Sequence, residues 1–282
     1  MKSLISFDGF ADVANNLIDK VSGAVGWVAT HDTPKREAVN TYIKEIQESD
    51  HDPLTKAALI SNAKRAIKDY KNQRNVLQNA TQFMLPTAKP QEVSEDWLAQ
   101  FMDKARLVSD SEVQMIWGRI LAEECNCPNS VPKGLLHVLE QMDRKNATDF
   151  SALCSVSVML VDNRGVSFSP VFLGGEHKGF YENLGLEYDT LVDLAAIGLI
   201  EQDCSFDTGS YVVDQLIQPA LVKYHDQEYA LPADIAEIPV GCVIFTRLGQ
   251  ALCKALSPVK HETFFTDICI PFWEKRFNEG NS

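Results

Sequence analysis

The stretch SVSVMLVDNRGVSFSPVF at residues 155–172 marks the point where the pattern of apolar residues changes. Apolar residues are concentrated in two short runs, 156–161 and 166–172, and the polar segment DNRG at 162–165 separates them. Short runs with a period of two are typical of strands, and a polar segment that contains glycine is typical of a hairpin turn. The stretch therefore predicts an antiparallel hairpin.

Before this stretch, apolar residues recur at every third or fourth position, which is the period of a helix. Expected N-caps support three of the helices: Asp52 followed by Pro53, Ser94, and Ser109 in a capping box with Glu112. We expect helices at 7–27, 34–48, 53–80, 96–107, 109–124, 133–143 and 147–153, with Thr33 and Pro34 starting the second and the apolar stripe of the third at Leu59, Ala63, Ala66, Tyr70 and Leu77.

After residue 172 the pattern is mixed. A helix is expected at 188–199, strands at 211–213, 216–224, 228–231 and 240–245, and a closing helix at 247–256 that Thr246 caps. The fold class is therefore α+β, with an all-helical N-terminal half followed by a mixed α/β half. We expect three parts: a long-helix region at 1–85, a helical bundle at 94–153 and an α+β domain at 155–282, with a linker around Pro86 and Pro90.

Composition limits the classes of function. The chain has 282 residues, with 26 Lys and Arg against 39 Asp and Glu, so its net charge is −13 and general affinity for a polyanion requires a local basic patch. Seven scattered cysteines do not form a disulfide framework, which favours a reducing compartment. The N-terminus lacks the pattern of a signal peptide, and no apolar run approaches the roughly 20 residues of a membrane span. We expect a cytoplasmic protein that makes no contact with a membrane.

One helix face is basic. It is the polar side of the helix at 53–80, and only Asp69 opposes its positive charge. One interpretation is a solvated face, or a face that meets the acidic C-terminal half or an acidic partner, and this is the one that we favour. The alternative is a nucleic-acid or phosphate site. The residues of the basic face are Lys56, Lys64, Arg65, Lys68, Lys71 and Arg74.

Residues with catalytic or metal-binding potential do not form a recognisable constellation. Cys125 and Cys127 lack the second pair that structural zinc requires, so we expect no metal and no cofactor. Glu123 lies close to an apolar stripe, where a carboxylate is more often a partner of Arg119 or a backbone amide than a catalyst. Enzymatic activity has no positive support in the sequence. A nuclease-type or nucleotide-acting effector stays open as an alternative.

Residues 94–153 carry a resemblance to a known family. An acidic residue and Trp open one helix, and a Ser-Asp pair opens the next, which ends in a Leu-Ala-x-Glu segment. This pattern resembles an uncharacterised bacterial family, domain of unknown function 2806, which is similar to the alpha proteins of abortive-infection systems. The resemblance implies a role near phage defence without naming a reaction. The residues that carry it include Asp96, Trp97, Ser109, Asp110, Trp117 and Glu123, of which we expect the two tryptophans to be core anchors.

The C-terminal half carries a second resemblance. The segment TLVDLAAIGLI at 190–200, the strands after it and FTRLG at 245–249 are similar to a winged-helix arrangement. A winged helix that binds DNA needs cations on its recognition helix and wing. Residues 181–240 contain Lys223 as their one Lys or Arg against twelve acidic residues. The resemblance therefore implies a protein-contact module or a DNA mimic.

These observations favour a cytoplasmic protein-interaction component of a bacterial antiphage system of the abortive-infection type. Its expected partner is another protein, such as a neighbouring defence component, and a second copy of the chain is a further candidate. A nucleic-acid-binding regulator that uses the basic helix at 56–74 is the third hypothesis.

Overall fold

The computed structural model describes residues 8–25, 36–163, 165–202, 211–213, 220–232, 235 and 238–280. The chain forms two compact units, residues 1–136 and 137–282. The expected bundle at 94–153 is therefore divided between them, because α7 (Arg144–Ser155) packs against α9 (Tyr188–Ala196) and α10 (Arg247–Leu256) of the C-terminal unit. A periodic pattern predicts the buried face of a helix but does not identify the element that covers it.

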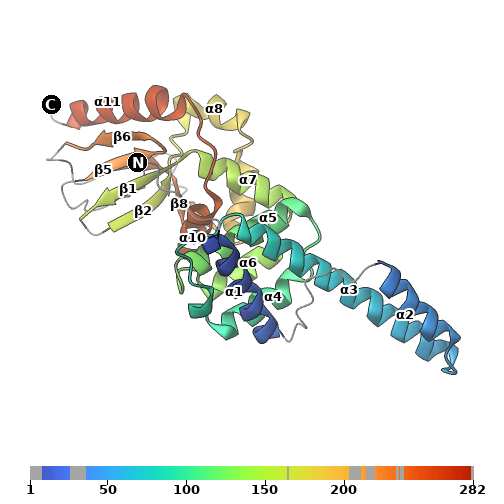
Figure 1. Ribbon diagram of the computed structural model, residues 1–282. Helices are drawn as coiled ribbons and strands as arrows, with labels where there is room; N and C mark the ends of the chain where they lie inside the picture. Colours follow the sequence, from blue (N-terminus) through green and yellow to red (C-terminus); the bar gives the residue numbers. More distant parts are fainter. Residues whose placement is uncertain are drawn as a thin grey trace. The chain divides into compact units, whose positions relative to one another are not determined.

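The N-terminal unit is built from helices packed around two tryptophans. Trp97 and Trp117 are 2% and 0% exposed, and Phe101 lies between them, with ring centroids 5.1 and 5.0 Å away. Both tryptophans are thus core residues, as expected. The elements of this unit are α1 (Asp8–Val25), α2 (Arg36–Glu48), α3 (Pro53–Thr81), the short helix η1 (Pro90–Glu92), α4 (Glu95–Ala105) and α5 (Ser111–Asn126), while α6 (Lys133–Gln141) spans the division (Figure 1).

Among the expected N-caps of the N-terminal unit that the structure describes, two are confirmed and one is wrong. Asp52 accepts hydrogen bonds from the amides of Leu54 and Thr55, and the Ser94 hydroxyl accepts one from the amide of Trp97. The helix after Ser109 is capped instead by Asp110, whose carboxylate reaches two amides of the first turn. Thr33 and Pro34, together with Phe7 and Trp27 at the ends of the first expected helix, lie outside the described residues.

The described residues of the C-terminal unit form three small antiparallel sheets. The largest has the strand order β2-β1-β5-β6, and its β1–β2 hairpin pairs Asp162 with Gly165, which confirms the expected hairpin. The other two sheets pair β3 with β8 and β4 with β7. The strands are β1 (Ser157–Asp162), β2 (Gly165–Pro170), β3 (Ile200–Gln202), β4 (Tyr211–Val213), β5 (Leu221–Tyr224), β6 (Gln227–Ala230), β7 (Ile238–Gly241) and β8 (Val243–Phe245).

The expected strand at 240–245 is two strands that belong to different sheets. Gly241 has a φ of +97°, and a side chain there would collide with the carbonyl group of Phe172. The chain turns at this glycine, since only glycine adopts such a backbone without strain, and β8 then pairs with β3. The expected strand at 216–224 is described only from residue 220 onward.

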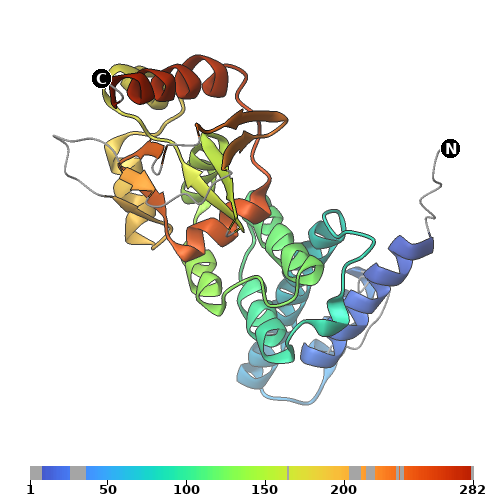
Figure 2. The same ribbon diagram turned by 90° about the vertical axis from the view of Figure 1, so that its left-hand side faces the viewer.

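The end of the chain holds helices that the sequence did not predict. After α10 come a π-helical segment, η3 (Phe264–Cys269), and α11 (Ile270–Gly280), which lies along β6 (Figure 1 and Figure 2). The indole of Trp273 donates a hydrogen bond of 2.8 Å to the carbonyl oxygen of Pro239 and so ties α11 to β7. The sequence also did not predict the short helices η2 (Gly175–His177) and α8 (Lys178–Asn183). Helices and strands together confirm the α+β class.

None of the described helices is both long enough and apolar enough to cross a lipid bilayer.

Candidate functional site

The first candidate is a helical arm in the N-terminal unit. We define it as residues 36–71, that is, α2 and the first part of α3 (Figure 1). Every buried residue of α3 lies at or beyond Asn72, and the earlier part of the helix is accompanied by α2. Among the described side chains of α2, Ile46 is the buried one. The arm therefore extends away from the other helices of its unit.

Side-chain hydrogen bonds fix the base of the arm. The amide of Asn72 donates to the carbonyl oxygen of Arg106 at 2.8 Å, and that of Gln73 donates to the carbonyl oxygen of Met102 at 2.9 Å. The guanidinium of Arg106 binds the carboxylate of Asp69 at 3.1 Å. Asp69, the acidic residue of the basic face, is thus turned toward the end of α4.

Four of the six predicted basic-face residues form an exposed stripe. Lys64, Lys68 and Lys71 follow one another at spacings of four and three, and Arg65 lies beside them; we call these four the cationic stripe. None of the four has an acidic partner within the described chain. Lys56 instead donates to the carbonyl oxygen of Gln47 at 2.8 Å, and Arg74 is half-buried and engaged in other contacts.

One part of the expected apolar stripe on this helix is wrong. Ala66 is exposed, whereas Leu59, Ala63 and Tyr70 of the expected stripe are half-buried and Leu77 is buried. Ile60 and Ile67 are half-buried as well, so the covered side of the helix is shifted toward these two isoleucines and away from Ala66.

The family-motif residues have structural roles. Trp97 and Trp117 fill the core, Asp110 caps α5, and Asp96 lies exposed in the first turn of α4. The Ser109 hydroxyl accepts a hydrogen bond of 3.3 Å from Asn72. The structure therefore brings no catalytic group together from these residues.

The buried carboxylate of this region is Glu124 and not Glu123. Glu124 is 1% exposed, and its two oxygens accept hydrogen bonds from the amides of Asn129 at 2.7 Å and Val131 at 2.9 Å. Burial raises the pKa of the Glu124 carboxyl, and these two amides counteract part of that shift. The signal was present in the sequence, because residue 124 lies seven positions, or two helical turns, after Trp117. Glu124 holds the loop after α5 in place.

The two cysteines beside this loop differ in exposure. Cys125 is buried, which raises the pKa of its thiol to about 12, whereas Cys127 is exposed. A thiol with such a pKa stays protonated and poorly reactive at neutral pH. Among the described residues no group of three or more His, Cys, Asp or Glu side chains has the arrangement of a metal site.

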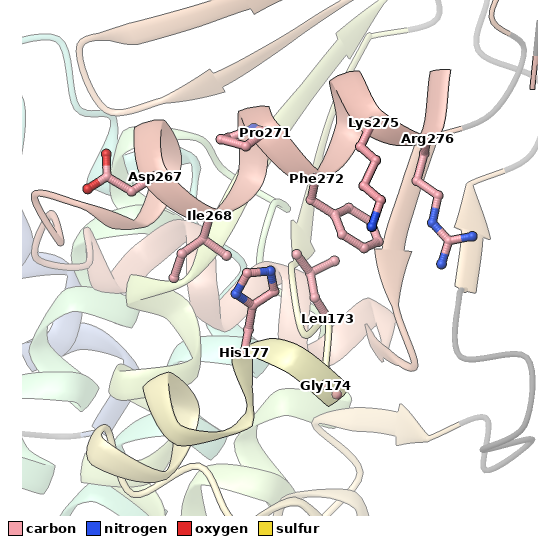
Figure 3. A pocket seen from close by; sticks show the side chains of 10 residues that line it. Leu173, Gly174, His177, Asp267, Ile268, Pro271, Phe272, Lys275 and Arg276 are labelled. Atoms are coloured by element: carbon pink, nitrogen blue, oxygen red, sulfur yellow. The ribbon is translucent and has the colours of Figure 1, made fainter. Parts of the chain in front are cut away.

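The second candidate is a pocket in the C-terminal unit. It has a volume of about 460 Å³ and lies between the loop that enters η2 and the helical segment of η3 and α11 (Figure 3). Its polar groups come from His177, Lys275 and Arg276, with Asp267 at one end. The sequence did not indicate this pocket, because α11 was not predicted and its partner loop is almost one hundred residues away.

A comparison with protein families identifies one match. The family described as a protein of unknown function, DUF2806, matches residues 61–269, which is more than two thirds of the chain. The chain belongs to the DUF2806 family. No curated protein and no solved structure matches it.

The DUF2806 match covers more than the motif at residues 94–153. It includes the cationic stripe, the loop that Glu124 holds and the Gly174–Gly175 segment of the pocket, while α1, α2 and α11 lie outside it. In this DUF2806 protein the arm thus combines a part of α3 inside the matched region with α2 before it. The pocket combines residues 173–177 and 267–268 inside the region with α11 after it.

Proposed function

We propose that this protein is a non-enzymatic interaction component whose arm binds an acidic surface of a partner protein. The observation that carries the proposal is the cationic stripe, four exposed cations without an acidic partner in the described chain. In a protein with a net charge of −13, such a stripe is an unusual local feature. Charge complementarity of this kind guides a partner to one surface and fixes its orientation.

The arm also exposes apolar side chains. Leu54 is 80% exposed and Tyr42 is 51% exposed, although both are large enough to gain from burial. Protein interfaces combine apolar and aromatic anchors with a charged rim. Leu54 and Tyr42 are the expected anchors, and the cationic stripe is the expected rim.

The extent of the positive charge favours a protein over a nucleic acid. Proteins that bind duplex DNA tightly neutralise on the order of 6–10 phosphates. The stripe offers four cations over eight residues of helix, roughly 10 Å of length. The acidic remainder of the chain would repel a long polyanion.

We further propose that the interaction serves a bacterial antiphage system of the abortive-infection type. The support is the resemblance of residues 94–153 to a family that is itself similar to abortive-infection alpha proteins. A cell that carries this gene with its neighbours should then restrict phage plating, and Lys64→Glu with Lys68→Glu should abolish the restriction while the protein level is unchanged.

The winged-helix relationship of the C-terminal unit is part of the proposal. It is supported by the succession of α9, a turn at Gly198 with a φ of +79°, and β3, which pairs with β8 through Ile200 and Phe245. Asp193 on α9 is bound by Lys145 at 3.2 Å, and Glu201 on β3 is exposed. Acidic groups on α9 and β3 would repel the phosphates of DNA, so this surface is better suited to contact with a protein.

The proposal is tested by co-purification. Full-length protein would be captured from cells that carry the gene and its neighbours, and bound proteins identified by mass spectrometry. We expect an acidic partner that is lost from the Lys64→Glu, Lys68→Glu variant. The matched control is Lys133→Glu with Arg247→Glu, which reverses two exposed cations outside the arm and should retain the partner. Equal recovery by both variants would contradict the proposal.

A further inference from the structure

The pocket in Figure 3 concentrates positive charge in the acidic part of the chain. The C-terminal unit has ten Lys and Arg against twenty-one Asp and Glu. Many of its cations are bound to carboxylates on the surface: Lys145 to Asp149 and Asp193, Lys178 to Glu182, Lys223 to Glu228, and Lys260 to Asp226.

Lys275 and Arg276 differ from these paired cations. Both are exposed, both line the pocket, and neither has a carboxylate partner within the described residues. The imidazole of His177 lines the pocket from the opposite element, on η2 (Figure 3). Three nitrogen-bearing side chains therefore border one cavity with no anion of the described chain bound to Lys275 or Arg276.

The acidic residue at the pocket does not neutralise these groups. Asp267 accepts a hydrogen bond of 2.7 Å from the Thr266 hydroxyl. Its carboxylate points away from Lys275 and Arg276, at the far end of the pocket (Figure 3).

The remaining wall is apolar. It is formed by the side chains of Leu173, Ile268, Pro271 and Phe272. The guanidinium of Arg276 lies over the ring of Phe272, 5.4 Å from its centroid, which holds this cation at the rim of the pocket.

Across the pocket from α11, the backbone of the Gly174–Gly175 segment is not covered by side chains. Gly174 and Gly175 both have positive φ angles, +59° and +50°, and a methyl group built on either would meet no atom within 4 Å. A ligand can therefore approach the main chain at these two residues, which is a common use of glycine at binding loops.

From these features we infer that the pocket binds a small phosphate monoester with an aromatic group. Arg and Lys are the side chains that proteins use to bind phosphate oxygens, and the apolar wall accommodates the ring. A cavity of about 460 Å³ lies within the range of small-molecule sites. This site is separate from the arm and does not depend on the proposed function.

Calorimetric titration of the full-length protein tests the inference. The probes are adenosine 5′-monophosphate and phenyl phosphate, with adenosine and inorganic phosphate as fragments. We expect at least one ester to bind, and each of its fragments to bind about tenfold more weakly. Lys275→Ala and Arg276→Ala should each lower the affinity about tenfold, since each removes a charged hydrogen-bond donor.

Arg247→Ala is the matched control. Arg247 is an exposed cation of the same unit that does not line the pocket, and its replacement should leave the affinity unchanged. Thermal melting would show that all three variants are folded. The inference is overturned if neither ester binds, if adenosine binds as tightly as its monophosphate, or if Lys275→Ala and Arg276→Ala bind like the unaltered protein.

Discussion

The carboxylate of Glu124 couples the stability of the N-terminal unit to pH. Burial raises its pKa above the ordinary value of 4.5, so the folded chain holds this proton more tightly than the unfolded chain does. The free energy of unfolding therefore falls as the pH rises above 4.5 through the pKa of the folded state. The two loop amides that bind its oxygens favour the ionised form and so counteract part of this shift in pKa.

We predict that Glu124→Gln destabilises the protein less as the pH is raised. Gln retains one acceptor and leaves one amide of the loop unpaired, which costs on the order of 1–3 kcal/mol. Since Gln does not ionise, the difference from the unaltered protein should shrink as the pH rises above 4.5 through the pKa of the folded state. Urea unfolding at a series of pH values above 4.5 measures this difference. Glu92→Gln is the control, because Glu92 is exposed and pairs with Lys89 at the surface. A cost that grows with pH would contradict the prediction.

Trp117 carries a second prediction at the residue scale. Its side chain is fully buried, and its indole N–H has no hydrogen-bond partner among the described residues. Trp117→Ala should lower the free energy of unfolding by about 3–5 kcal/mol, the range for a buried aromatic. Trp117→Phe should cost clearly less, because it keeps most of the buried ring and removes the unpaired donor. Chemical denaturation compares the two variants with the unaltered protein. The prediction is wrong if Trp117→Ala is as stable as the unaltered protein, because a ring whose removal costs nothing would have to lie at the surface.

At the scale of elements, the helices α3 and α5 approach each other closely at Gly118. A methyl group on Gly118 of α5 would lie 2.5 Å from the Cβ of Asn79 and 2.9 Å from the backbone nitrogen of Ala80. These neighbours belong to the buried part of α3, and a backbone atom cannot move aside as a flexible side chain does. The glycine therefore sets the distance between the two helices.

We predict that Gly118→Ala destabilises the protein by about 1–3 kcal/mol, the usual cost of overpacking, despite the higher helix propensity of alanine. Gly23→Ala in α1 is the matched control, since a methyl group there meets no atom within 4 Å. It should leave stability unchanged or raise it by up to ~1 kcal/mol. Thermal unfolding distinguishes the two, and a stabilised Gly118→Ala protein would show that the helices can separate without loss.

The sequence predicted elements that depend on local interactions. The β1–β2 hairpin, the helix at 53–80 and the cap at Thr246 all follow from residues a few positions apart. Local patterns did not reveal α11, because its four apolar residues come first and its charged residues follow them. They also did not reveal that the strand expected at 240–245 divides at Gly241, because this division depends on the carbonyl group of Phe172, which is distant in sequence. The cationic stripe was predictable because it lies on one helix. The pocket was not, because its walls come from distant segments.

At the scale of the whole molecule, charge is unevenly distributed. The N-terminal unit is close to neutral, with sixteen Lys and Arg against eighteen Asp and Glu, and the C-terminal unit carries most of the net charge of −13. The cationic stripe lies in the nearly neutral unit. A polyanion that approached it would also meet the field of the rest of the chain, whereas a compact acidic protein surface need contact only the arm.

This distribution predicts how salt affects binding. The unaltered protein should not retard single-stranded or duplex oligonucleotides in a gel at ~150 mM salt, where non-specific contacts are already weak. Its association with the acidic partner should slow as salt is raised, because exposed charges are screened over a Debye length of about 8 Å at that ionic strength. Lys64→Glu with Lys68→Glu should remove most of this salt dependence, and Lys133→Glu with Arg247→Glu should preserve it. Retardation of oligonucleotides that disappears in the Lys64→Glu, Lys68→Glu protein would assign the stripe to nucleic acid instead, since phosphate contacts respond to charge reversal on every sequence alike.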